Sequence, residues 1–348
     1  MRINHYIGQH DWKAMPQKID VIDKKIAFLL CKNSRLSNTA IAKALKIKRE
    51  VVSYRIKKMV ERDFLYGFIT RINPRKLGFM IHFVYLKLKT PSNEKELMNE
   101  LVEHPEITNL KNVGGRFDIY MEITTKNVEE FDHFLRKILD KHGEMVHDYS
   151  ILQSVSEKPM DLDLLLEENN KELNRLKTLT ESKGSSFHKE LETQSKDNHP
   201  VELETLDKQI LNIIKLNCRS NLKDIAKEVH SNYPLVHRKI KKMIENGVIT
   251  TFTIFFSLAH LGLQMYPVLF NLRNLDENKF LTYLDSHPYV LWSHKLVGNW
   301  NYQVNIFARN NAHFHDILND IRENFSENIV SFDTMMVFSS LKAVQRVD

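Results

Sequence analysis

The sequence predicts an α+β protein in which one unit occurs twice, each unit being a helix-turn-helix module followed by a small module of strands and helices. Two observations predict this fold. The chain of 348 residues matches itself at a nearly constant offset. Within each copy, apolar residues recur first at helical spacing and then in strand-like and helical segments that alternate. A chain of this length accommodates several domains of roughly 100 to 200 residues each.

The internal repeat is direct over the first part of each copy. Residues 22–26 correspond to 206–210 and residues 33–35 to 217–219, both at an offset of 184. In the second part of each copy the offset becomes 183, which indicates one residue lost or gained in a loop. The duplication covers about 135 residues twice, a repeat long enough to organise the whole fold.

The repeat and the composition between its copies predict the domain boundaries. The segment between the copies is polar and charged, which is typical of a linker. Its leucines from Leu162 to Leu179 have helical spacing, and its part after Gly184 is expected to be flexible. The predicted domains are an N-terminal extension (1–18), a first helix-turn-helix domain (19–76), a first βαββαβ domain (77–155), the linker (156–202), a second helix-turn-helix domain (203–260) and a second βαββαβ domain (261–348).

Positive charge is concentrated on the two helix-turn-helix segments. Residues 19–76 contain 15 Lys and Arg against 5 Asp and Glu, and residues 203–260 contain 9 against 5, whereas the whole chain carries a net charge of +6. Basic charge on such segments is the pattern expected for contact with DNA phosphates. A single Lys pair could equally belong to a solvated helix face. The concentration of basic residues on both helix-turn-helix segments, taken together, indicates double-stranded DNA as the partner.

Three helices are expected in the first helix-turn-helix module. The first carries an apolar stripe from Ile22 to Leu30, the second is capped by Ser37 or Asn38, and the third begins near Lys48. The apolar face of the third helix consists of Val52, Ile56, Met59 and Val60. The residues of this copy expected to contact DNA are Lys48, Arg49, Ser53, Tyr54, Arg55, Lys57 and Lys58.

The second copy repeats this design. Ser231 is a natural N-cap for its third helix, and Pro234 falls in the first turn, where a missing N–H costs little. A strand-like run follows each third helix, at residues 67–72 and 250–256, which makes each module a winged or strand-flanked helix-turn-helix. The DNA contacts expected in this copy are Asn232, Tyr233, His237, Arg238 and Lys241.

The second half of each copy has the element order βαββαβ. In the first copy the strand-like segments are 80–89, 107–113, 117–124 and 145–155, and the helical segments are 93–102 and 128–141. The second copy follows the same order from Met265 to Leu341.

These residues resemble the Lrp/AsnC (leucine-responsive regulatory protein) family of bacterial and archaeal transcriptional regulators. The resemblance is carried by the end of the first helix, Leu30-x-x-Asn33-x-Arg35, and by the third-helix pattern Val52, Arg55, Ile56 and Met59. The second copy matches with Asn217 and Arg219, and with Val236, Lys239, Ile240 and Met243. The resemblance implies a tandem-duplicated DNA-binding regulator, without cofactor or catalytic residues, whose ferredoxin-like βαββαβ domains pair as an intramolecular pseudo-dimer and assemble further into homo-oligomers.

In this family, a Gly-x-x-Asp pattern between the second and third strands helps to bind an amino-acid effector. Gly115 and Asp118 fit the pattern, whereas the second copy has Gly298 and Asn301 and lacks the acid. The resemblance therefore implies a small-molecule effector, such as an amino acid, with these four residues as its candidate site. Turn geometry alone would also explain both glycines.

An enzyme is the alternative interpretation. Siroheme decarboxylases resemble this family in both modules, and residues 292–295 (Trp-Ser-His-Lys) resemble their strand region. The equivalent residues 109–112 contain no histidine, and a basic third helix would have no purpose in such an enzyme. The sequence therefore favours a regulator and not an enzyme.

The cysteines and histidines predict no disulfide and no metal site. Cys31 and Cys218 are not equivalent in the repeat and are expected to be reduced packing or surface thiols. His313 and His315 would face different directions on a helix, which makes a poor metal site. His104 and His287 precede prolines at helix ends, where the helix dipole favours a cation, so a structural role is expected. The sequence has neither a secretory signal nor a membrane-spanning run, which indicates a cytoplasmic protein.

Overall fold

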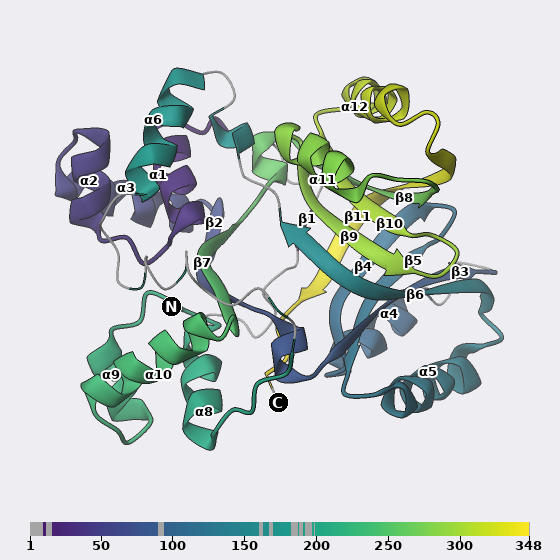
Figure 1. Cartoon of the computed structure of the whole chain (residues 1–348), viewed down its shortest axis with the longest axis horizontal. Coiled ribbons are helices and arrows are strands. Elements are labelled where there is room, and N and C mark those ends of the chain that lie inside the picture. Colours follow the sequence, from purple (N-terminus) through teal and green to yellow (C-terminus); the bar gives the residue numbers. More distant parts are fainter. Residues whose placement is uncertain are drawn as a thin grey trace. The chain divides into compact units, whose positions relative to one another are not determined.

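A computed structural model describes residues 10–11, 16–89, 94–159, 163–166, 170–181, 187, 191, 197 and 199–347. These residues form two compact units. One unit holds the helix-turn-helix segments of both copies together with the linker from Asp163 onward, and the other holds both βαββαβ modules (Figure 1). The chain is therefore grouped by type of module and not by copy.

Each helix-turn-helix module consists of three helices followed by one strand, as expected. The elements of the first copy are α1 (Val21–Lys32), α2 (Asn38–Leu45), α3 (Arg49–Glu61) and β2 (Leu65–Ile72). Those of the second copy are α8 (Thr205–Ile214), α9 (Leu222–Glu228), α10 (Tyr233–Glu245) and β7 (Ile249–Phe256). Cys31 and Cys218 are both buried in this unit as free thiols, so they are packing residues.

Local hydrogen bonds explain where these helices begin. The Ser37 side chain accepts a hydrogen bond from the backbone N–H of Ala40 and caps α2. The N-cap of α10 is Asn232, whose side chain accepts from the N–H of Leu235. The expected cap Ser231 was wrong by one residue, because the extended backbone that aims a capping side chain at the first turn occurs at Asn232.

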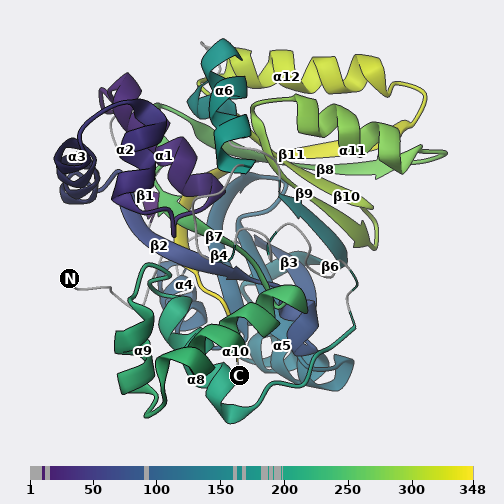
Figure 2. The ribbon, with the colours of Figure 1, turned by 60° about the vertical axis from the view of Figure 1, so that its left-hand side comes forward.

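The strand after each third helix pairs with the equivalent strand of the other copy. β2 and β7 run antiparallel, and Ile69 pairs with Thr253, its own counterpart in the repeat. An approximate twofold axis therefore passes through this pair. Among the described residues, this sheet has only these two strands, with one helix-turn-helix module on either side (Figure 2). Each copy thus supplies one strand to a shared sheet instead of closing a wing of its own.

The linker packs on the first helix-turn-helix module. Its described elements are η3 (Asp163–Leu165) and the helix α6 (Asn170–Glu181), which begins later than the expected helix. Leu176 of α6 is fully buried, Glu172 pairs with Lys25 of α1 at 2.9 Å, and Arg175 donates to the carbonyl of Ala44 at 3.0 Å. Most of the part after Gly184, for which flexibility is expected, lies outside the described residues.

The other unit contains two βαββαβ modules with the predicted element order. The first consists of β3 (Met80–Leu88), α4 (Glu94–Glu103), β4 (Ile107–Gly115), β5 (Ile119–Thr125), α5 (Val128–His142) and β6 (Val146–Pro159). The second consists of β8 (Gln264–Leu272), α11 (Glu277–Ser286), β9 (Val290–Val297), β10 (Tyr302–Ala308), α12 (Asn311–Asn324) and β11 (Ile329–Ala343). Short 3-10 turns, η1 (Pro74–Leu77) and η4 (Ala259–Leu261), precede β3 and β8.

The last strand of each module joins the two modules. The first half of β6 pairs with β3 and its second half with β9 of the other copy, while β11 pairs first with β8 and then with β4. Eight strands therefore close into the ring β4-β5-β3-β6-β9-β10-β8-β11, and β1 (His10–Asp11) adds to β11. Helices α4 and α5 lie outside one half of the ring, and α11 and α12 outside the other (Figure 1).

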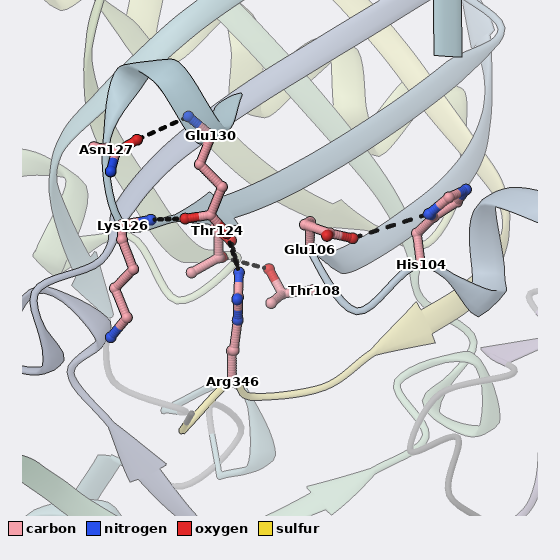
Figure 3. A network of polar contacts seen from close by, with 8 residues as sticks. All are labelled: His104, Glu106, Thr108, Thr124, Lys126, Asn127, Glu130 and Arg346. Atoms are coloured by element: carbon pink, nitrogen blue, oxygen red, sulfur yellow. Dashed lines mark hydrogen bonds and ion pairs between the residues drawn. The ribbon is translucent and has the colours of Figure 1, made fainter. Parts of the chain in front are cut away.

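The end of the second copy also contacts the first. Arg346 donates to the carbonyl of Thr124 at 2.6 Å and lies 3.2 Å from a carboxylate oxygen of Glu130 (Figure 3). His104, near the same network, is 3.9 Å from Glu106. Burial lowers the pKa of His104, and likewise that of His287 at the end of α11. Burial thus disfavours the charged imidazole at both helix ends, and a structural role remains the prediction for these histidines.

Gly115 and Gly298 lie where one copy touches the last strand of the other. Both have positive φ angles, +124° and +146°. A Cβ on Gly115 would be 2.7 Å from the carbonyl oxygen of Thr334 in β11, and a Cβ on Gly298 would be 3.1 Å from that of Ile151 in β6. Glycine is required at both places by backbone conformation and by close approach of the other copy.

Gly115→Ala is expected to lower the free energy of unfolding by about 2 kcal/mol or more, because it adds backbone strain to a steric clash. Gly67→Ala in β2 is the matched control, since a Cβ there meets nothing within 4 Å. Urea denaturation of both variants measures the difference. Equal stability of the two variants would contradict the close approach of the copies at Gly115.

Candidate nucleic-acid interface

The third helix of the first copy has one buried and one exposed face. Val52 and Met59 are 0% and 3% exposed and anchor α3 to its module. Arg49, Ser53 and Lys57 follow one another at intervals of four residues on the exposed face, which places them in one stripe. Tyr54 beside them is 61% exposed. Lys48 is the exposed N-cap, and Lys58, at the rim, pairs with Glu61 at 2.7 Å.

The third helix of the second copy presents a related but different face. Val236, Ile240, Met243 and Ile244 are buried, as predicted. Tyr233 and Arg238 are exposed, Asn232 is the exposed N-cap, and Lys241 is half-buried, 3.8 Å from Glu245. His237 is half-buried and not fully exposed, because its ring stacks on Phe187 of the linker with 4.9 Å between ring centroids.

Arg55 does not lie on the exposed stripe. Its guanidinium donates to Asp23 of α1 at 2.9 Å and lies 3.4 Å from Asp20. The counterpart Lys239 makes the equivalent pairs, with Asp207 at 3.3 Å and Glu204 at 2.8 Å. The structure therefore gives Arg55 an internal role, in place of the predicted contact with DNA. The signal for this role was the aspartate repeated in the first helix of both copies.

A reciprocal pair of arginines joins the two helix-turn-helix modules. Arg219 of the second copy donates to the carbonyl of Ser34 at 2.9 Å, and Arg35 of the first copy donates to the carbonyl of Cys218. These carbonyls belong to equivalent residues, and the Ser34 hydroxyl and the Cys218 thiol are 2.7 Å apart. The Asn-x-Arg motif of each copy therefore binds the same motif in the other copy.

Aromatic rings complete this seam, defined here as the β2–β7 ladder with Arg35 and Arg219. The guanidinium of Arg219 lies 5.0 Å from the ring of Phe68 in β2, and that of Arg35 lies 5.5 Å from the ring of Phe252 in β7. Burial lowers the pKa of both arginines, yet arginine remains protonated at neutral pH. The Asn-x-Arg motif could be recognised in the sequence but its partner could not, because no local pattern shows which carbonyl a side chain will reach.

The four residues expected at an effector site lie at two turns, Gly115 and Asp118 at the turn from β4 to β5, and Gly298 and Asn301 at the turn from β9 to β10. The Asp118 carboxylate accepts from the backbone N–H of Leu88 at 2.8 Å and from Lys87 at 2.9 Å. Asn301 holds the equivalent strand end through both the N–H and the carbonyl of Leu272. Asp118 and Asn301 therefore each hydrogen-bond a hairpin to a strand of the same module. The nearby Gly115 and Gly298 lie against the other copy.

Residues 292–295, which resemble a siroheme decarboxylase strand, form part of β9. The ring of His294 meets Phe83 of the first copy edge to face, with 4.9 Å between centroids. The counterpart Lys111 is buried, donates to Asn109 at 2.6 Å, and its pKa is lowered by burial to about 8. Within the described ranges, no three His, Cys, Asp or Glu side chains gather as metal ligands, and none of the helices is long and apolar enough to cross a membrane.

Comparison with known proteins identifies the family. The model of winged helix-turn-helix DNA-binding domains matches residues 19–65 and 203–250, and that of the Lrp/AsnC ligand binding domain matches residues 80–158 and 268–347. Together these matches cover more than half of the chain. The chain belongs to the Lrp/AsnC family. It is a tandem duplication within that family, since each domain model matches twice.

Relatives of this Lrp/AsnC protein are about as long as one of its copies. The HTH-type transcriptional regulator FL11 of Pyrococcus furiosus is 31% identical over 137 residues, which are 39% of this chain and 90% of FL11. The HTH-type transcriptional regulator Ptr1 of Methanocaldococcus jannaschii is 33% identical over 117 residues, which are 34% of this chain and 79% of Ptr1.

One solved structure matches both copies at once. The siroheme decarboxylase NirDL superposes with a TM-score of 0.62 over 94% of this Lrp/AsnC chain and 93% of its own, at 12% sequence identity. This likeness shows a common fold.

Proposed function

We propose that this Lrp/AsnC protein is a sequence-specific transcriptional regulator that binds double-stranded DNA through α3 and α10. The observation that carries the proposal is that the apolar face of each third helix is buried or half-buried, while its opposite face carries exposed basic and aromatic residues. A helix anchored in this way can enter the major groove, with its cations against the phosphates. The relatives named as regulators support the same function.

The two recognition faces differ, so the two half-sites should differ as well. Arg49, Ser53 and Lys57 form the stripe in the first copy, where the second has Tyr233, His237 and Lys241. Different side chains read different base edges in the major groove. A single chain would then bind an operator without twofold symmetry, in contrast to a dimer of identical subunits.

Replacing Arg49, Tyr54 and Lys57 together by alanine is expected to abolish specific binding without unfolding the domain. If both lost cations contact phosphates, the slope of log affinity against log salt should also become shallower by about 2. A duplex enriched by the wild-type protein from a random library serves as the probe in gel-shift titrations at several salt concentrations. The control Lys95→Ala/Lys137→Ala/Tyr149→Ala removes the same charges and one exposed tyrosine from the βαββαβ unit.

Unchanged affinity in the triple variant would refute the proposed interface. In that case the alternative, a siroheme decarboxylase-like enzyme, becomes testable by the absorption spectrum of added siroheme. The likeness to NirDL supports this alternative at the level of the fold, whereas the basic faces of α3 and α10 favour the regulator.

We propose further that the βαββαβ unit binds a small effector such as an amino acid, and that the first copy is the better site. Asp118 supplies a carboxylate for an ammonium group, whereas Asn301 does not. Lys87 already neutralises Asp118 at 2.9 Å, so a ligand ammonium must displace it.

Calorimetric titration of the full chain with single amino acids tests this site. Asp118→Asn, which installs the residue of the second copy, should weaken binding about tenfold or more, because a charge-assisted hydrogen bond is lost. Lys87→Ala should strengthen it, because the competing cation is removed. The reciprocal variant Asn301→Asp is expected to gain a second site. Binding that is indifferent to Asp118→Asn would contradict the assignment.

A further inference from the structure

A chain of hydrogen bonds leads from the second copy to the recognition helix of the first. Arg219 donates to the side-chain oxygen of Asn38 at 2.9 Å. The amide nitrogen of Asn38 donates in turn to the hydroxyl of Ser53 at 2.7 Å. Asn38 is the first residue of α2, and Ser53 is the central residue of the exposed stripe on α3.

The chemistry of these groups fixes the direction of every hydrogen bond. Arginine has donors only, so the oxygen of the Asn38 amide must face Arg219 and its nitrogen must face Ser53. A serine hydroxyl has one proton and two acceptor lone pairs. Because Asn38 occupies an acceptor position of Ser53, this hydrogen bond does not use the hydroxyl proton, which can be donated outward from the exposed side chain.

The Ser53 hydroxyl belongs to a stripe with two cations. Arg49 and Lys57 stand one turn before and one turn after Ser53, and all three side chains are exposed. A hydrogen-bond donor in this place meets an acceptor of the duplex, which is either a phosphate oxygen or an acceptor on a base edge.

We propose that Arg219 of the second copy is a positioning residue for DNA recognition by the first. Acting through Asn38, it holds Ser53 as an outward hydrogen-bond donor to an acceptor group of the duplex. This inference rests on the proposed DNA binding and deepens it, since it makes contact at one half-site depend on a residue of the other copy.

The second copy lacks the same relay. Leu222 occupies the place of Asn38, and His237 that of Ser53. Arg35 lies 5.8 Å from the ring of Phe187, on which His237 stacks. The recognition helix of the second copy is thus linked to Arg35 of the first copy through the aromatic rings of Phe187 and His237, and not through directed hydrogen bonds. The two copies therefore offer different groups at the same helical position.

Gel-shift titration of the full chain on its enriched duplex tests the relay. Substitution of Arg219 itself could open the seam, so the main variant is Asn38→Leu, which installs the residue of the second copy. Asn38→Leu and Ser53→Ala should each weaken binding by about tenfold, the worth of one hydrogen bond to DNA. The double variant should bind no worse than Ser53→Ala alone, and Ser53→Thr should retain most of the affinity because it keeps the hydroxyl.

Two controls separate positioning from stability. Asn99→Leu, the same substitution at an exposed position of α4 in the βαββαβ unit, should leave affinity unchanged. Urea denaturation should show that Asn38→Leu is folded under the binding conditions. Wild-type affinity for Asn38→Leu, or losses that add fully in the double variant, would overturn the relay.

A base-pair scan of the enriched duplex identifies the acceptor. If Ser53 donates to a base edge, Ser53→Ala relaxes specificity at one position, and if it donates to a phosphate, affinity falls equally for all sequences. A wild-type protein that binds no duplex would refute the proposed function itself, a result distinct from failure of the relay.

Discussion

The structure of the helix-turn-helix unit depends on one reciprocal interaction, in which the arginine at the end of each first-helix motif binds the backbone of the same motif in the other copy. Arg35 reaches the carbonyl of Cys218, and Arg219 reaches that of Ser34. Both lie beside the shared β2–β7 ladder, which alone would be a small sheet of two strands. Together they convert a duplicated sequence into one unit that holds two recognition helices.

Duplication within one chain frees the two copies to diverge around this common frame. In a dimer of identical subunits, both recognition helices must carry the same residues. Here the internal contacts of the two modules are retained, since Arg55 and Lys239 make equivalent ion pairs, whereas the exposed stripes of the third helices differ. The contacts behind these stripes also differ between the copies. In the first copy Ser53 accepts a hydrogen bond from Asn38, and in the second copy His237 stacks on Phe187. Under the proposed function, the chain would read two different half-sites with a fixed connection between them.

Sequence periodicity predicted the fold well, because helices and strands are set by local spacing of apolar residues. The start of α3, the buried Val52 and Val236 and the βαββαβ order all agree with it. Contacts between distant residues could not be predicted in this way. The pairing of β2 with β7, the internal ion pair of Arg55 and the stack of Phe187 on His237 depend on tertiary structure alone. A charged residue on a helix can form an internal ion pair or face the solvent, and the spacing of residues along the helix does not distinguish the two.

Quantitative footprinting combined with the stoichiometry of the complex tests the central claim most directly. If the seam holds two unlike recognition helices in one chain, a single chain bound per duplex should protect two half-sites of different sequence. A complex that required two chains, or a palindromic operator with both halves equally protected, would contradict the account.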